Sequence, residues 1–115
     1  MKGMKFKSDK FKKARGGYSR LLEISCAKCG ERICFYQKDG PGILKRMYVD
    51  RMLSSQKSEK VRGAAVKDLP QLICNNCKEL IGVPILYKKE NRPAYRLFVG
   101  SAAKKIVNSK KTVAD

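Results

Sequence analysis

Cys26-Ala27-Lys28-Cys29 and Cys74-Asn75-Asn76-Cys77 decide the fold of this 115-residue chain, which contains no histidine. A Cys-x-x-Cys turn directs two thiolates at one ion, so one pair supplies half of a tetrahedron and a second pair completes it. The two pairs therefore predict one zinc ion bound by Cys26, Cys29, Cys74 and Cys77, with about 2.3 Å between each sulfur and the metal. Because protein fills all four positions, we expect the zinc to be structural.

Other uses of the cysteines remain open from the sequence. The same four ligands bind iron in rubredoxin-like electron carriers, and Cys-x-x-Cys also forms redox dithiols and disulfides. A fifth cysteine, Cys34, belongs to neither pair. We expect it to be a small buried residue on a strand; the alternative is a thiol that competes for the metal or oxidises.

Both cysteine pairs resemble the knuckles of the zinc-ribbon family, in which two β-hairpins clamp one zinc. The resemblance covers roughly residues 20–100 and implies a small, mostly β fold with Cys26, Cys29, Cys74 and Cys77 as ligands. The chain departs from the family at two points. The knuckles lie farther apart than the usual span of about 15–20 residues. Lys78 also follows Cys77 where the family prefers glycine, whereas Gly30 follows Cys29 as expected.

The remaining sequence predicts strands around the two knuckles. We expect strands at 21–24 and 32–37, and a hairpin formed by 85–89 and 94–99. Residues 43–52 follow a turn at 38–42, which favours a returning strand over a helix. Residues 101–107 have a weak helical pattern. Each half thus follows the plan strand, Cys-x-x-Cys, strand, turn, strand.

Composition divides the chain into three parts. Residues 1–17 form a basic N-terminal arm, 18–100 the zinc-ribbon-like domain, and 101–115 a basic C-terminal tail. Within the domain, 53–68 is polar, small and basic, and we interpret it as a flexible linker between the knuckles. No stretch approaches the roughly 20 apolar residues of a membrane helix, so we expect no membrane partner.

The charge of the chain points to its partner. Lysine and arginine number 27 against 10 acidic residues, giving a net charge of +17. Nucleic acid is the usual partner of so basic a small protein, and bases beside aromatic residues suit phosphates with occasional stacked bases. The candidate RNA-binding residues are Lys5, Lys7, Lys10, Lys12, Lys13, Arg15, Lys45, Arg46, Arg51, Lys88, Lys89, Arg92 and Arg96.

Size, charge and architecture together resemble small ribosomal proteins that fill crevices in folded RNA. The resemblance implies an rRNA-binding component of a ribosome or a similar ribonucleoprotein, beside other ribosomal proteins in the cytoplasm or an organelle matrix. A DNA- or polymerase-associated zinc ribbon of transcription or replication is the main alternative, and a rubredoxin-like electron carrier is a third. Because the chain lacks histidine, a phosphate-binding glycine loop and a suggestive carboxylate pair, we expect neither an enzyme nor a small-molecule substrate.

Overall fold

Two antiparallel four-stranded sheets make up the described part of the chain. The computed structural model describes residues 19–40, 43–53 and 64–107, and these contain no α-helix. Sheet A has the order β4-β2-β1-β8 and consists of Met52–Leu53, Arg32–Asp39, Ser19–Cys26 and Ala102–Val107. Sheet B has the order β3-β7-β6-β5 and consists of Arg46–Tyr48, Arg92–Leu97, Leu80–Tyr87 and Leu72–Ile73. The prediction of a small, mostly β protein is confirmed.

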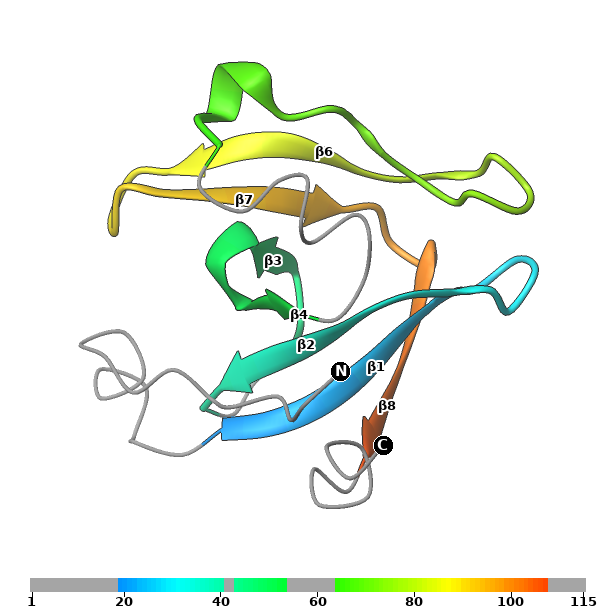
Figure 1. The fold of residues 1–115 in the computed structure, drawn as a ribbon. Coiled ribbons are helices and arrows are strands. Elements are labelled where there is room, and N and C mark those ends of the chain that lie inside the picture. Colours follow the sequence, from blue (N-terminus) through cyan, green and yellow to red (C-terminus); the bar gives the residue numbers. More distant parts are fainter. Residues whose placement is uncertain (1–18, 41–42, 54–63, 108–115) are drawn as a thin grey trace.

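The sheets approach each other at one end and diverge at the other. The turns that carry the cysteine pairs, cyan and yellow-green at the right of Figure 1, lie at the narrow end. Toward the opposite end, the edge strands β4 of sheet A and β3 of sheet B, joined by the 3-10 turn η1 (Val49–Arg51), lie between the longer strands of the two sheets. The cysteine turns can connect the sheets only at the narrow end. Other residues must connect them at the diverging end.

The two knuckles lie in hairpins of the same register, 48 residues apart. Ser25 pairs with Arg32 in the first hairpin, and Ile73 pairs with Leu80 in the second. The register shifts one step before each of these pairs, so that Ile24 faces Cys34 and Leu72 faces Gly82. The shared plan of strand, knuckle and strand is therefore confirmed, down to the position of the irregularity.

The third strand of the plan differs between the halves. In the second half, β6 and β7 form the predicted hairpin. In the first half, the chain leaves sheet A after β2, and the next strand, β3, pairs with β7 of sheet B. Residues 43–52 are accordingly neither one strand nor a helix, because within a few residues the chain joins sheet B, turns through η1 and returns to sheet A as β4.

The helical interpretation of 101–107 is wrong. Ala102–Val107 forms β8, which pairs with β1 over Leu21–Cys26. Without β8, the backbone N–H and C=O groups on this side of β1 would form an open edge. This pairing outweighs a helical preference that is weak in the sequence.

Several predicted segments lie partly outside the described residues. These are the arm at 1–17, most of the linker at 53–68 and the last part of the tail. The described end of the linker contains the 3-10 turn η2 (Val66–Asp68), and Leu69 directly after it is buried.

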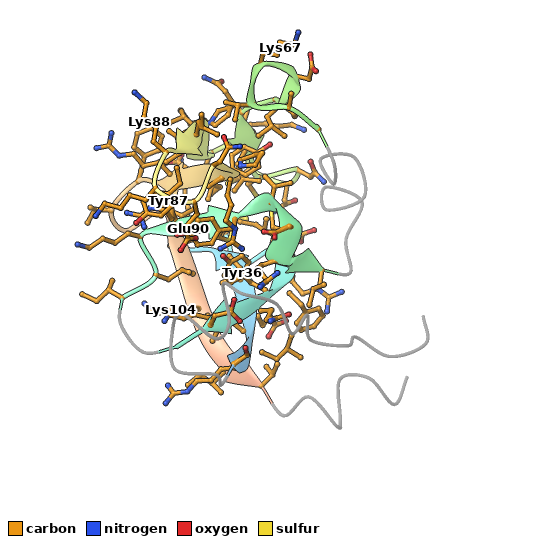
Figure 2. The ribbon with its side chains drawn as sticks, turned by 90° about the vertical axis from the view of Figure 1, so that its left-hand side faces the viewer. Tyr36, Lys67, Tyr87, Lys88, Glu90 and Lys104 are labelled. Atoms are coloured by element: carbon orange, nitrogen blue, oxygen red, sulfur yellow. The ribbon has the colours of Figure 1, made fainter. Side chains whose placement is uncertain are left out.

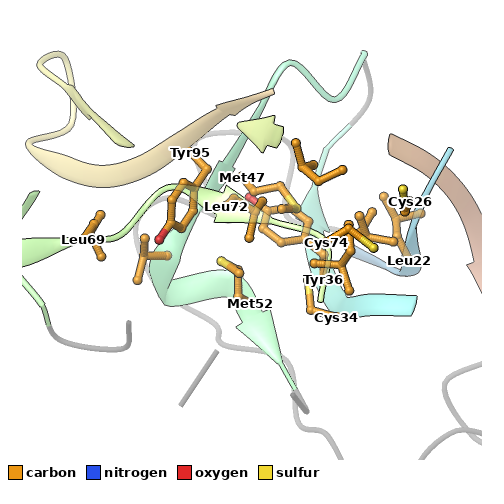
Figure 3. Packing of buried hydrophobic residues seen from close by; sticks show 14 residues of the cluster. Leu22, Cys26, Cys34, Tyr36, Met47, Met52, Leu69, Leu72, Cys74 and Tyr95 are labelled. Carbon is orange, nitrogen blue, oxygen red and sulfur yellow. The ribbon is translucent and has the colours of Figure 1, made fainter. Parts of the chain in front are cut away.

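The larger of two apolar clusters fills the space between the sheets and extends to the cysteine turns. Figure 3 shows this cluster, in which Leu22 and Tyr36 of sheet A lie beside Met47, Leu72 and residues of the second knuckle. The hydroxyl of Tyr36 accepts a hydrogen bond from the backbone N–H at the end of β3, at 2.8 Å. Cys26 and Cys74 belong to the same cluster, so the knuckles are continuous with the core.

Buried ion pairs connect the sheets at their diverging end. Arg51 and Arg92 are only 1% and 4% exposed. Nε of Arg51 lies 2.9 Å from Oδ2 of Asp39 at the end of β2, and its Nη1 lies 3.3 Å from Asp50. Arg92 of β7 lies 2.8 Å from Asp50 and 2.9 Å from Glu90. Asp50 therefore bridges an arginine bound to sheet A and an arginine of sheet B.

Hydrogen bonds keep Asp39 ionised within this network. Burial by itself would raise the pKa of the Asp39 carboxyl, but hydrogen bonds from Ser19, Gln37 and Arg51, together with the charge of Arg51, lower it overall. The hydroxyl of Ser19 lies 2.6 Å from Oδ1, and the amide nitrogen of Gln37 lies 2.8 Å from it. Asp39 is thus a carboxylate at neutral pH.

Asp39→Asn should lower the free energy of unfolding at neutral pH by about 3 kcal/mol, the lower end of the range for breaking a buried pair, because the buried Arg51 guanidinium loses its nearer carboxylate and keeps Asp50. Urea unfolding followed by circular dichroism measures the change. Glu23→Gln is the matched control, because the Glu23–Arg32 pair is 4.0 Å long and its side chains are 30% and 54% exposed. We expect that control to cost less than about 1 kcal/mol. Equal losses in the two variants would contradict a special role for the buried pair.

Candidate metal centre

Four cysteine sulfurs converge where the two sheets meet. Cys26 ends β1, Cys29 lies in the following turn, and Cys74 and Cys77 lie in the turn between β5 and β6. All four Sγ atoms lie within 4.8 Å of one another. Two separations between the knuckles are 3.6 Å for Cys26–Cys77 and 3.5 Å for Cys29–Cys74.

These separations suit a tetrahedral metal ion. Four sulfurs placed about 2.3 Å from one ion are separated by about 3.8 Å along each edge of the tetrahedron. The sulfurs here need only small movements to reach that arrangement. The predicted set of Cys26, Cys29, Cys74 and Cys77 can therefore hold a metal ion.

The backbone builds both knuckles in the same way. In the first, the N–H of Gly30 donates to the carbonyl of Cys26, and the N–H of Cys26 donates to that of Glu31, both at 2.8 Å. In the second, the N–H of Lys78 donates to Cys74 at 3.0 Å, and the N–H of Cys74 donates to Glu79 at 2.9 Å. These bonds hold each turn closed without a metal.

Both turns require a left-handed backbone at the residue after the second cysteine. Gly30 has φ 84° and Lys78 has φ 66°. Lys78 thus takes the conformation that glycine provides in the family pattern, even though a side chain makes it less favourable. Its Nζ donates to the carbonyl of Asn75 at 2.9 Å, which closes the same turn from outside.

Hydrogen bonds within and between the knuckles shift the pKa values of the cysteine thiols. Hydrogen bonds from the Asn76 side chain and from the backbone N–H of Glu31 lower the pKa of the exposed Cys29 thiol to about 6. For Cys77, a hydrogen bond from the N–H of Glu79 lowers the pKa, but burial and the neighbouring cysteine thiols outweigh it and raise the pKa to about 12. Cys29 therefore loses its proton more readily than Cys77, and a bound cation would displace the protons that remain.

The fifth cysteine lies apart from the metal centre. Cys34 is fully buried on β2 within the apolar core, and the four-sulfur group does not include it. It faces Ile24 across the β1–β2 pair. This is the position expected of a small core residue.

The predicted RNA-binding residues fall into separate groups. Arg51 and Arg92 are buried, and carboxylates occupy their guanidinium groups, so they have no surface to offer to RNA. Lys88 and Lys89 are exposed in the turn between β6 and β7, where Figure 2 labels Lys88. The six candidates between Lys5 and Arg15 lie outside the described residues.

The other three candidates, Lys45, Arg46 and Arg96, line one surface pocket together with Lys104 of β8. Sequence reasoning placed Lys104 in the tail and did not select it. The sequence does not show that residues 102–107 pair with β1, and this pairing is what brings Lys104 to the pocket. The labelled side chain of Lys104 projects from β8 in Figure 2.

Aromatic residues near these cations belong mostly to the core. Tyr48 and Tyr95 are buried, as expected when a strand turns its aromatic residues inward. The guanidinium of Arg92 covers the Tyr48 ring at 3.8 Å, and that of Arg46 covers the Tyr87 ring at 4.3 Å. These rings support arginines, and they are not free to stack on bases.

Comparison with protein-family models, with curated proteins and with solved structures finds no match for this chain. Among the described residues, no helix is long and apolar enough to cross a membrane.

Cys74→Ser should remove the bound metal and abolish cooperative unfolding, because metal binding to such sites contributes about 10–16 kcal/mol of folding free energy. Elemental analysis measures the metal per chain, and thermal melting monitored by circular dichroism reports folding. Cys34→Ala is the control: it removes a buried thiol outside the cluster, so it should keep the metal and lower stability only modestly. A normal melt for Cys74→Ser would show that the four-ligand assignment is wrong.

Gly30→Ala should lower the free energy of unfolding by about 1–2 kcal/mol, the cost of a side chain in the left-handed region. No atom lies within 4 Å of the added Cβ, so the change tests backbone conformation alone. Lys78→Gly, at the equivalent position, should destabilise the protein less than Gly30→Ala, because relief of the left-handed strain offsets the loss of the exposed hydrogen bond from Nζ to Asn75. Urea unfolding of both metal-loaded variants gives the comparison. Destabilisation of equal size in both would contradict the equivalence of the knuckles.

Proposed function

We propose that the cysteine centre holds one structural zinc ion. Four thiolates without histidine form a closed tetrahedral ligand set, which leaves no position for water or substrate. Zinc has no redox chemistry and no geometric preference of its own, so it suits a site that only connects two hairpins. Iron in the same ligands would make the protein coloured; a colourless sample with one zinc per chain supports this proposal over an electron carrier.

We further propose that the protein binds nucleic acid, and specifically rRNA as a structural component of a ribosome or similar ribonucleoprotein. The observation that carries the proposal is the net charge of +17 on 115 residues. Folding sharpens this charge imbalance. Asp39, Asp50 and Glu90 bind the two buried arginines, so these carboxylates are not available to balance lysines on the surface.

A zinc clamp and a high positive charge complement each other. Repulsion among like charges opposes the compact state, and a core from so short a chain contributes only modest stability. A metal that joins the two sheets covalently through sulfur offsets that repulsion. Phosphates of folded RNA would supply the remaining compensation when the protein is bound.

Co-sedimentation with ribosomes through sucrose gradients tests the assignment to rRNA. We expect the protein to migrate with a ribosomal particle at moderate salt and to dissociate as salt increases, because its binding depends on counterion release from phosphates. Titrations of an rRNA fragment and of a duplex DNA over the same salt series provide the comparison. Preference for the duplex DNA would favour the transcription or replication alternative, and failure to bind any ribosomal particle would overturn the rRNA proposal.

A further inference from the structure

A surface pocket lies where the chain passes from sheet B to sheet A. Its volume is about 530 Å³, within the range of small-ligand sites. Its apolar lining includes Leu44, Ile85 on β6 and Leu97 at the end of β7. The turn at 98–100 and the start of β8 complete its wall.

Cations surround this apolar surface, and none of its lining residues is acidic. Lys45, Arg46, Arg96 and Lys104 all line the pocket. Arg46 and Arg96 face each other directly as partners in the β3–β7 pair. Like charges placed opposite each other on adjacent strands are destabilising. Among the described residues, no carboxylate forms an ion pair with Lys45, Arg96 or Lys104. The rim of the pocket is thus suited to an anion.

Large apolar side chains are exposed beside these cations. Phe98 is 45% exposed, Ile43 is 76% exposed and Val99 is fully exposed, and all three line the pocket. Exposed apolar groups gathered in a single hollow indicate a binding site more strongly than scattered ones do. The pocket therefore offers an apolar surface and a ring of positive charge to the same ligand.

Hydrogen bonds hold Phe98 in place despite its exposure. Its backbone N–H donates to the carbonyl of Ile81 at 3.1 Å. The hydroxyl of Ser101 lies 2.8 Å from the carbonyl oxygens of both Ile81 and Phe98, and Gly100 takes φ 76° to close the turn. These bonds fix the backbone from which the Phe98 ring projects, so the turn needs little reordering when a ligand binds beside the ring.

We propose that this pocket binds an unpaired nucleotide of a single strand, with the base against Phe98 and the adjacent phosphates at Arg46, Arg96 and Lys104. The proposal deepens the nucleic-acid function proposed above and rests on it. Aromatic rings stack on any base, and arginine adds both charge and a second planar surface. A nucleic acid carries a negative charge at every residue, which matches four cations around one apolar pocket. An acidic peptide matches them only if acidic and apolar residues alternate along its sequence.

The test compares Phe98→Ala with the parent by fluorescence anisotropy on three labelled probes: a 12-nucleotide oligouridine, an abasic strand of the same length, and a 12-base-pair duplex RNA. Stacking of one base contributes about 1–3 kcal/mol, so Phe98→Ala should weaken oligouridine binding about 5- to 150-fold. Its affinity for the abasic strand and the duplex should match that of the parent. Leu86→Ala is the matched control, since Leu86 is 43% exposed and lies outside the pocket.

Arg96→Gln supplies a second, electrostatic readout. It should weaken binding of oligouridine and of the abasic strand alike, and should reduce the slope of log affinity against log salt by about 1 on the oligouridine. Thermal melts equal to that of the parent establish that each variant is folded. An unchanged salt slope in a folded Arg96→Gln would show that Arg96 does not contact a phosphate and would overturn this arrangement.

The remaining outcomes separate this proposal from the broader one. If the parent binds abasic and base-bearing strands equally and Phe98→Ala changes nothing, the nucleotide pocket is overturned while nucleic-acid binding stands. If the parent binds none of the three probes, both proposals fail. If Phe98→Ala weakens binding to a peptide of alternating glutamate and phenylalanine, or to phosphatidylserine vesicles, but not to oligouridine, the occupant is a protein or a lipid surface and the nucleotide proposal is overturned.

Discussion

The convergence of four sulfurs at the junction of two sheets is the constraint on which the rest of the structure depends. Neither sheet is large, and the apolar core that they share reaches the cysteine turns without covering them. Hydrogen bonds within each turn set the positions of its two sulfurs, but the bonds between turns are few. The Lys28–Glu79 ion pair across the knuckles is 3.4 Å long and exposed, so it contributes little. A metal ion shared by the four cysteines, which the geometry of the sulfurs permits, would be strong enough to fix the sheets relative to each other.

The diverging end of the sheets uses a different kind of connection. There the chain places Arg51 and Arg92 between the sheets and surrounds them with Asp39, Asp50 and Glu90. Burying such charges is costly unless every partner is present, so the network specifies one arrangement of the sheets more than it adds stability. It also accounts for the position of Asp39, the buried acidic residue among those described. The cysteine centre and the ion-pair network hold opposite ends of the same core.

The sequence predicts those parts of this fold that depend on local chemistry. Four cysteines in two turns are a local pattern, and the structure brings them together as expected. The β6–β7 hairpin follows from strand composition around a short turn. By contrast, β8 forms only because β1 has an edge that needs a partner, and residues 43–53 change sheets to fill the wedge between them. Arg51 and Arg92 look like surface cations in the sequence, because the neighbouring Asp50 and Glu90 do not reveal the more distant pairs, Arg51 with Asp39 and Arg92 with Asp50. Long-range pairing decided each of these cases.

The turn at 98–101 gives the metal centre an influence beyond stability. The backbone N–H of Ala27, inside the first knuckle, donates to the carbonyl of Ser101 at 3.1 Å, and the Ser101 hydroxyl contacts the carbonyls of Ile81 and Phe98. The first knuckle, sheet B and the wall of the cationic pocket therefore meet at one serine. Thermodynamic linkage makes the consequence reciprocal. If metal binding and ligand binding favour the same arrangement of this turn, each would strengthen the equilibrium binding of the other by the same factor.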